Sequence, residues 1–514
     1  MRRAPEAQVK VRGLNVPSLD MRNPAALFWA FVLCHGIVWT LMPMISRQNG
    51  PVDVIELFNW GRYPQWGYWK HPPLPAWVVG VLAPLGDKRL WGAYLASQIA
   101  ICACFWAVWR FARDFLEPPH ALLSVLLLEG VYYYNFRSIE FNHSVLLLPF
   151  WSWTALLLWQ ALHSGSLRHW LLCGVMIGLG LLTKYAMFLL LVPLVVFMLL
   201  NDQARKSLAK PGPYIALAVA AVIFMPHVVW VFSHDFTTIN YALDGAKSRG
   251  HLMDHLLNPL VFASIQALTL VPVMSMVGSL LIGSMANRRQ VAAAGFPRAF
   301  LFTVALGPFL VILAISAIMG FELRARWGTE LWSFIGIFVF YHLRPVLTPR
   351  SLHRFTYVFL TAAALPVAVY IGHLTLIPRL IGRPMRGHFP GQTIADYVTT
   401  QWAKRVGARL PIVAGDKWFT ANIGFYSPDR PDVFTDLDPR KSWWTSDEEL
   451  QHKGGIIVWD AGRAGGEFPG RWRTRFPMAA VQPVISFPWQ TSVALFPVQM
   501  GWAIVPPSSP HSSP

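Results

Sequence analysis

Charged residues are scarce in this sequence. Only 13% of its 514 residues are Asp, Glu, Lys or Arg, whereas 54% are hydrophobic. Soluble domains carry about 25% charged residues, so this composition excludes an ordinary soluble enzyme and indicates a membrane protein. Cysteine is also rare, and the four present, Cys34, Cys102, Cys104 and Cys173, all lie in apolar stretches. We therefore expect neither a disulfide framework nor a cysteine metal site.

Acidic residues are fewer than basic residues, so the formal net charge is +17. In a soluble protein this excess would suggest nucleic acid as a partner. In a chain rich in apolar runs it indicates basic loops that orient helices and meet lipid phosphates. We therefore expect membrane lipids as partners and no nucleic acid. The sequence also contains no glycine-rich nucleotide motif and no internal repeat.

Apolar runs that approach the length of a membrane span, about 20 residues, predict a polytopic α-helical membrane protein with about eleven transmembrane helices. They cover residues 25–45, 89–112, 119–136, 143–162, 169–183, 186–200, 213–233, 257–284, 299–319, 329–346 and 355–376. The fifth and sixth runs meet at Lys184, and separating them there keeps the charge pattern of the connections regular.

Basic residues occur in the N-terminal segment and in every second connection after it. They are Arg2, Arg3, Lys10, Arg12, Arg110, Arg113, Arg168, Arg205, Lys206, Lys210, Arg288, Arg289, Arg298, Arg344, Arg350 and Arg354. The positive-inside rule then places the N-terminus in the cytoplasm. With an odd number of spans, the C-terminal part lies in the periplasm of a bacterial inner (plasma) membrane.

The composition changes after about residue 377, where polar and charged residues return. The predicted parts are a cytoplasmic segment 1–24, a membrane domain 25–377 with a first outer loop 46–88, a periplasmic α/β domain 378–505 and a disordered Pro/Ser-rich tail 506–514. In the outer loop, helices over 53–60 and 74–85 are expected to lie at the membrane surface. In the periplasmic domain, the patterns predict a helix over 392–406 and strands over 410–414, 455–459 and 493–498.

Asp53 and Glu56 are the first candidate site residues, in the first outer loop. At this spacing the two carboxylates share one face of a helix, and one of them can act as general base on an acceptor hydroxyl. The alternative is an ordinary solvated helix at the membrane surface. Lys70 and His71 follow, directly before two prolines that suit a helix start. Lys70 is either a phosphate ligand or a surface anchor of the chain.

Further candidates come from later outer connections. Arg137 and Glu140 precede the fourth run and are either a structural ion pair or part of a site, and His143 is either a ligand or an ordinary helix-end residue. Lys184 lies between two very apolar segments. Arg324 and Arg326 lie on a later connection. With Lys70 and Lys184, these arginines predict a basic pocket for a lipid phosphate.

These motifs carry a family resemblance. Asp53 followed by Trp66-Gly-Tyr-Trp-Lys-His-Pro-Pro-Leu74 resembles the first outer loop of GT-C glycosyltransferases of the protein mannosyltransferase and aminoarabinose transferase superfamily. Arg137-Ser-Ile-Glu140 and Gly180-Leu-Leu-Thr-Lys184 are similar to two further motifs of that superfamily. The resemblance covers roughly residues 25–240. It looks closest to bacterial transferases that modify lipopolysaccharide, including the galacturonosyl type.

The resemblance implies a GT-C fold and a sugar donor linked to polyprenyl phosphate. Asp53 would be the base in an inverting displacement, and Lys70, Lys184 and one of the two arginines would neutralise the leaving phosphate. The acceptor would be lipid A, lipopolysaccharide or another glycolipid. No cofactor is expected, a divalent metal is not indicated by the residues, and the chain is expected to be a monomer.

Two departures from the superfamily pattern leave alternatives open. The usual Asp-Glu pair is here Asp53-Val54, with the second acid displaced to Glu56, so either carboxylate remains a candidate base. The acid before the fourth run, often Asp, is Glu140. A different reading of the whole chain is a transporter or lipid flippase. Such proteins place polar sites near the bilayer midplane, often between paired repeats, whereas the charges here lie on the outer connections.

Overall fold

The computed structural model describes residues 19, 21–83, 90–246, 250–282, 295–463, 465–491, 493 and 495–508. Most of the predicted N-terminal segment 1–24 and of the predicted tail 506–514 lies outside these ranges. So do six of the basic residues used to orient the chain, namely Arg2, Arg3, Lys10, Arg12, Arg288 and Arg289.

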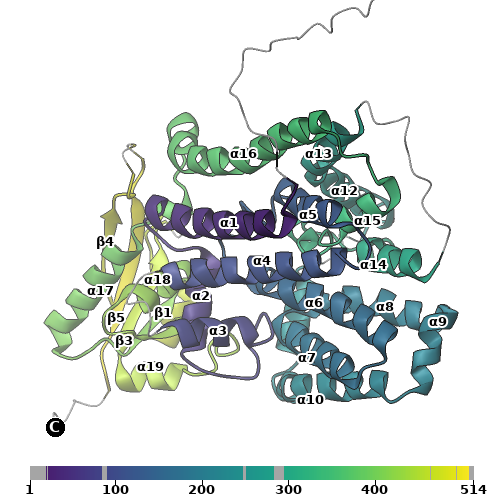
Figure 1. The fold of residues 1–514 in the computed structure, drawn as a ribbon. Helices are drawn as coiled ribbons and strands as arrows, with labels where there is room; N and C mark the ends of the chain where they lie inside the picture. Colours follow the sequence, from purple (N-terminus) through teal and green to yellow (C-terminus); the bar gives the residue numbers. More distant parts are fainter. Residues whose placement is uncertain are drawn as a thin grey trace, which may run out of the picture.

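Long helices lie side by side and form the larger part of the molecule (Figure 1). Asn23 begins the first of them by accepting a hydrogen bond from the N–H of Ala26, with Pro24 at the first helical position. The helices and 3₁₀ turns of this part are α1 Pro24–Ser46, α2 Val52–Gly61, α3 Leu74–Leu82, α4 Trp91–Ala112, α5 Pro118–Leu126, η2 Leu127–Gly130, α6 His143–Ser164, α7 Leu167–Thr183, η3 Tyr185–Met187, α8 Phe188–Leu200, α9 Asp202–Arg205, η4 Lys206–Ala209, α10 Gly212–Ser233, α11 Thr237–Asp244, α12 Asp254–Thr269, α13 Val271–Leu281, α14 Phe296–Met319, η5 Ala325–Gly328, α15 Ile335–Leu343 and α16 Pro349–Ile381.

The number of spans differs from the prediction. Among the described residues, six helices are long and apolar enough to cross a membrane, or up to eight if each of two bent helix pairs counts as one span. The predicted count of eleven is therefore not confirmed. The run 119–136, for example, is the short α5 followed by turns, buried in the helix bundle. The polar groups of its irregular backbone form hydrogen bonds inside the protein; for example, Asn135 donates to the Glu129 carbonyl at 2.7 Å. Irregular backbone at membrane depth is tolerated where it is buried in protein, and the run is apolar because it is buried there.

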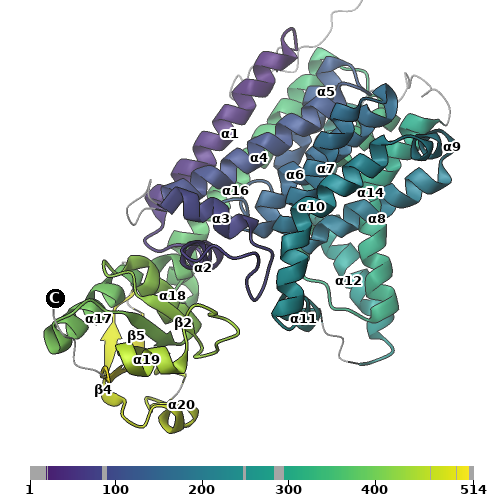
Figure 2. The same cartoon turned by 90° about the horizontal axis from the view of Figure 1, so that it is seen from below.

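The C-terminal domain is a five-stranded sheet with helices, beyond one end of the bundle (Figures 1 and 2). Its elements are η6 Arg386–His388, α17 Gly391–Val406, β1 Ile412–Gly415, α18 Lys417–Tyr426, β2 Asp432–Thr435, α19 Asp447–Lys453, β3 Gly455–Asp460, α20 Gly470–Arg475, β4 Ala480–Phe487 and β5 Val498–Val505. The strand order is β2-β1-β3-β5-β4, with β2, β1 and β3 parallel and the last two pairs antiparallel.

The α/β character of this domain agrees with the prediction, and α17, β1 and β3 fall where helix and strands were expected. The strand expected over 493–498 is wrong, because β5 begins only at Val498. Pro497 directly precedes it, and proline cannot donate to a ladder. α16 runs to Ile381, a few residues past the predicted domain boundary at residue 377.

Helix α2 joins the two parts of the molecule. Ile55 packs in the same apolar cluster as Phe389 and Phe419 of the C-terminal domain, and Asn59 Nδ2 donates to the Ala421 carbonyl at 3.0 Å. Figure 2 shows α2 between the bundle and α18. The sequence predicts α2 as a surface helix, but its residues from Val54 to Trp60 are buried. A solvated α2 is therefore excluded, and its carboxylates lie at the junction between bundle and domain.

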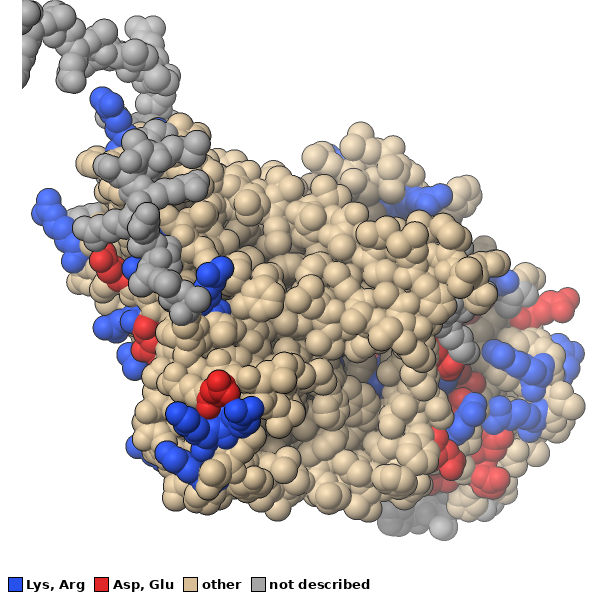
Figure 3. All heavy atoms as spheres, turned by 90° about the vertical axis from the view of Figure 1, so that its right-hand side faces the viewer, with Lys and Arg blue, Asp and Glu red and all other residues tan. Residues whose placement is uncertain are grey.

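Charge is distributed unevenly over the surface. In Figure 3, a broad band contains few charged side chains, and Lys, Arg, Asp and Glu gather toward two opposite edges. The helices beside this band expose large apolar side chains, for example Leu217 at 68% and Val222 at 74%. A band with few charges and with exposed apolar side chains suits the core of a bilayer.

We expect reporter fusions to report cytoplasm after Arg205 and periplasm after Leu450. The reason is the alternation of basic connections, which the positive-inside rule places in the cytoplasm. Alkaline phosphatase and green fluorescent protein fusions at both positions measure this directly. Cytoplasmic signals at both Arg205 and Leu450 would contradict the odd number of spans.

Candidate active site

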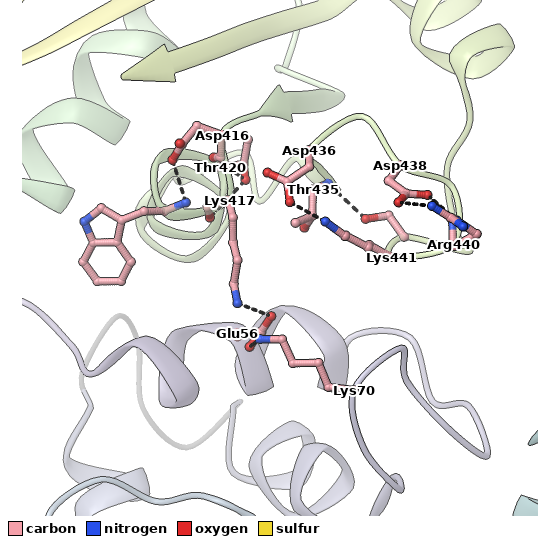
Figure 4. A network of polar contacts seen from close by, with 12 residues as sticks. Glu56, Lys70, Asp416, Lys417, Thr420, Thr435, Asp436, Asp438, Arg440 and Lys441 are labelled. Carbon is pink, nitrogen blue, oxygen red and sulfur yellow. Dashed lines mark hydrogen bonds and ion pairs between the residues drawn. The ribbon is translucent and has the colours of Figure 1, made fainter. Parts of the chain in front are cut away.

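Two lysines converge on Glu56 at the bundle–domain junction. Lys70 Nζ lies 2.5 Å from one carboxylate oxygen and Lys417 Nζ lies 3.2 Å from the other. Figure 4 shows Lys417 reaching from the start of α18 toward α2. Asp416 caps that helix by accepting from the backbone N–H of Trp418 at 2.9 Å, which fixes the helix start from which Lys417 extends. The C-terminal domain therefore contributes a cation to this site.

The electrostatics of Glu56 make it a poor candidate base. Burial opposes its ionisation, but the charges of Lys70 and Lys417 outweigh burial and lower its pKa. Glu56 in turn raises the pKa of Lys417 although burial opposes it. A carboxylate held by two ammonium groups binds an extra proton weakly. Of the two carboxylates on α2, Glu56 is the one held in this way by two lysines.

Aromatic rings surround these lysines. The ring of Trp69 lies 4.7 Å from Lys70 Nζ, 5.6 Å from Lys417 Nζ and 5.1 Å from Lys441 Nζ. Tyr241 of α11 packs against the same ring at 5.1 Å between centroids. Cations over an aromatic face are stabilised by the ring quadrupole. Trp69 thus holds three lysines from both parts of the chain close together.

A histidine pair follows Lys70. The rings of His71 and His143 lie 4.0 Å apart, and Asn142 caps α6 by accepting from the N–H groups of Ser144 and Val145, which fixes His143 at the helix start. Burial and then the nearby His143 and Lys70 hold the pKa of His71 well below its ordinary value. His71 is therefore neutral at pH 7, so it can exchange hydrogen bonds with a ligand but adds no positive charge.

Lys184 is anchored on the other side of the site. Its Nζ lies 2.9 Å from Glu330 and donates to Ser144 Oγ at 2.7 Å. The Glu330 side chain is only 2% exposed. Both lysines predicted to bind a phosphate, Lys70 and Lys184, are therefore paired with a glutamate, and a phosphate would compete with these carboxylates.

A cavity of about 100 Å³ connects these groups. Of the residues predicted from sequence, its lining includes Asp53, Glu56, Lys70, His71, Arg137, His143, Lys184 and Arg326. Glu140 and Arg324 do not line it. Glu140 instead lies behind Asp53, where it accepts from the Asp53 backbone N–H at 3.5 Å and lies 3.7 Å from Arg137. Arg324 is exposed beyond the cavity lining.

The two neighbouring carboxyls, Asp53 and Glu140, differ in environment. Burial first, and then the charge of Asp53, raise the pKa of Glu140. This shift favours the neutral form of Glu140, which adds no second negative charge beside Asp53. Glu140 is thereby suited to positioning Asp53 through the α2 backbone.

Sequence reasoning missed Lys417 and Lys441 and left Glu330 and Tyr241 without a role. Lys417 and Lys441 lie more than 350 residues from α2 in the chain, and no local pattern relates them to Glu56. Glu330 follows Arg326 closely in the sequence, but its ion pair with Lys184 depends on the fold. Among the residues that the structure describes, no three His, Cys, Asp or Glu side chains form a possible metal site.

We expect Lys184→Met to destabilise the protein by about 3–5 kcal/mol, because it leaves the buried Glu330 carboxylate unpaired. Adding Glu330→Gln to this variant should restore most of the loss, since the amide carries no charge. Thermal unfolding of the purified variants in detergent micelles measures both effects. An unchanged midpoint for Lys184→Met would mean that the pair contributes nothing to stability.

Comparisons with known proteins show which family and which fold this chain resembles. Residues 70–230 match the family model described as dolichyl-phosphate-mannose-protein mannosyltransferase. The lipid A galacturonosyltransferase RgtD of Rhizobium johnstonii is 28% identical over 197 residues, which are 38% of this chain and 41% of that protein. The matched region thus spans about two fifths of that relative's length.

Solved structures extend the similarity to almost the whole chain. ArnT from Cupriavidus metallidurans bound to undecaprenyl phosphate superposes with a TM-score of 0.58 at 16% identity, covering 94% of this chain and 98% of that one. The apo state of the same ArnT gives 0.54 at 15% identity with the same coverage. The resemblance seen in the sequence motifs is thereby confirmed: the chain has the GT-C fold of ArnT, and its residues 70–230 match the mannosyltransferase family model.

Proposed function

We propose that this chain is a membrane glycosyltransferase that moves a sugar from a polyprenyl-phosphate donor to lipid A, lipopolysaccharide or another glycolipid. One observation carries the proposal. A single cavity at the bundle–domain junction holds the Asp53 carboxylate together with the cations of Lys70, Lys184 and Arg326. A base and a group of cations are what displacement of a phosphate leaving group needs.

The proposed reaction is an inverting displacement. The acceptor hydroxyl oxygen forms a bond to the anomeric carbon while the bond from that carbon to the phosphate oxygen breaks. The lipid phosphate leaves with the electron pair, and Lys70, Lys184 and Arg326 stabilise its charge. The hydroxyl proton passes to Asp53. Neither a nucleotide nor a metal enters this reaction.

The proposed classes of donor and acceptor rest on similarity to known proteins and on the residues of the cavity. The matched family and the ArnT structures suggest a sugar donor linked to a lipid phosphate. RgtD, which is a lipid A galacturonosyltransferase, suggests a glycolipid acceptor and a uronic acid as a first sugar to test. The periplasmic side of the inner membrane is the proposed location, since the charged cavity lies at the end of the bundle that carries the C-terminal domain.

Mass spectrometry of envelope glycolipids from strains with and without the gene tests the function. We expect one glycolipid to lose a single sugar residue when the gene is deleted. Purified protein, a synthetic short-chain prenyl-phosphate sugar and that glycolipid should then reconstitute transfer, with inversion at the anomeric carbon detected by NMR. Movement of the labelled lipid across a vesicle membrane without sugar transfer would contradict the proposal and support a flippase.

A further inference from the structure

A second cavity, of about 340 Å³, lies behind Asp53. Arg137 lines both cavities, so the two adjoin, while Glu140 lines only the second. Arg47, directly after α1, and Arg386, at the start of the C-terminal domain, complete its basic lining. Three guanidinium groups and one carboxylate therefore face one space, and nothing in the reaction derived above uses it.

Two of the three arginines of this cavity, Arg47 and Arg386, have no acidic partner among the described residues. Arg47 donates its Nε–H to the Asn49 carbonyl at 3.1 Å, and Arg386 packs over the ring of Trp418 at 5.9 Å. In the part of the chain that the structure describes, no carboxylate lies within ion-pair distance of either guanidinium. Arg137 and Glu140 are separated by 3.7 Å. Guanidinium groups present donors in a planar fork that matches phosphate and carboxylate, so the cavity fits an anion.

Most of the remaining lining is apolar, although it also includes His373. Ile139, Tyr370, Leu374 and Met385 line the cavity beside the arginines. The neighbouring helices expose apolar side chains, including Ile45 of α1 at 78%. An anion site at the ends of the helices α1 and α16, with apolar side chains beside it, suits the charged head of an amphiphile better than a free ion.

We propose that this cavity binds an anionic group, phosphate or carboxylate, of the glycolipid acceptor. The inference rests on the proposed function and names its acceptor class. In an inverting displacement the acceptor hydroxyl and the leaving phosphate lie on opposite faces of the anomeric carbon. The two basic cavities share Arg137, and Glu140 of the second cavity accepts from the Asp53 backbone N–H. With the donor phosphate in the first cavity, the acceptor's anion in the second brings the hydroxyl to Asp53 from the other side.

Binding of defined lipids to the purified protein in detergent tests the site. The probes are a bis-phosphorylated lipid A, the same lipid A after phosphatase treatment, phosphatidylglycerol and inorganic phosphate. We expect Arg47→Gln and Arg386→Gln each to weaken binding of the phosphorylated lipid A roughly tenfold to hundredfold, the effect of losing a hydrogen bond to a charged group. Neither variant should weaken binding of the dephosphorylated lipid A.

Arg383→Gln is the matched control, because Arg383 is exposed, lies three residues from Arg386 and does not line the cavity. It should bind like the unsubstituted protein, and size-exclusion profiles should show that all variants fold. Equal affinity for phosphatidylglycerol would overturn the assignment to the acceptor, and displacement by millimolar inorganic phosphate alone would make this a free-anion site. Equal losses with both lipid A forms would also overturn it.

A kinetic readout separates this inference from the proposed function. Arg47→Gln should raise the KM for a phosphorylated acceptor while the KM for the prenyl-phosphate donor stays unchanged. If the unsubstituted protein transfers no sugar but binding still depends on Arg47, the proposed function fails and an anionic-lipid site remains. If transfer proceeds and neither arginine affects acceptor KM, the inference alone fails.

Discussion

Asp53→Asn is expected to abolish most sugar transfer while donor binding persists. Loss of a general base typically costs about 10²–10⁴-fold in rate. Asn keeps the shape of the side chain and cannot accept the hydroxyl proton, so the loss reports on chemistry. The measurement is the turnover of purified variants with a synthetic prenyl-phosphate sugar, together with their affinity for the prenyl-phosphate product.

Glu56→Gln and Glu140→Gln are the matched comparisons for Asp53. Glu56→Gln should reduce turnover less, because Glu56 is held by Lys70 and Lys417 and its lowered pKa makes it a weak proton acceptor. If Asp53→Asn retains near-normal turnover while Glu56→Gln is inactive, the displaced acid is the base. If only Glu140→Gln is inactive, the base lies before α6 and α2 merely shapes the cavity.

Lys70→Met is expected to weaken binding of the donor phosphate by roughly tenfold to a hundredfold, the usual contribution of a hydrogen bond between charged groups. Lys70 is paired with Glu56 before the donor arrives. When Lys70 turns to the phosphate, Lys417 still compensates Glu56, so the rearrangement leaves no buried carboxylate unpaired. Isothermal titration with a short-chain prenyl phosphate measures the affinity.

Two lysine substitutions control this experiment. Lys404→Met removes an exposed lysine of α17 that does not line either cavity and should leave affinity unchanged. Without Lys417, Glu56 would hold Lys70 more firmly, so Lys417→Met should weaken phosphate binding indirectly. The effect of Lys417→Met should therefore vanish when Glu56 is also replaced by Gln. Unchanged affinity of Lys70→Met would reduce Lys70 to an anchor of the chain at the membrane surface.

The sequence by itself determined the class of the protein and most of the residues at its site. Scarce charge and long apolar runs require a membrane protein, since a bilayer excludes unpaired charge. Asp53, Lys70 and Lys184 could be chosen as candidates from the sequence, because a charged residue beside an apolar run is energetically costly and is usually functional. The helices α2 and α3 were also predictable, because their apolar spacing and the prolines before α3 are local signals.

Only the tertiary structure decided how these residues are paired and how many runs are long helices. Hydropathy does not give helix length, so the runs 119–136 and 329–346 were predicted as spans, whereas their helices α5 and α15 have nine residues each. Lys417 reaches Glu56 because α2 docks on α18, a contact between segments far apart in the chain. Local patterns cannot encode such a contact, because it depends on the packing of two separately formed surfaces.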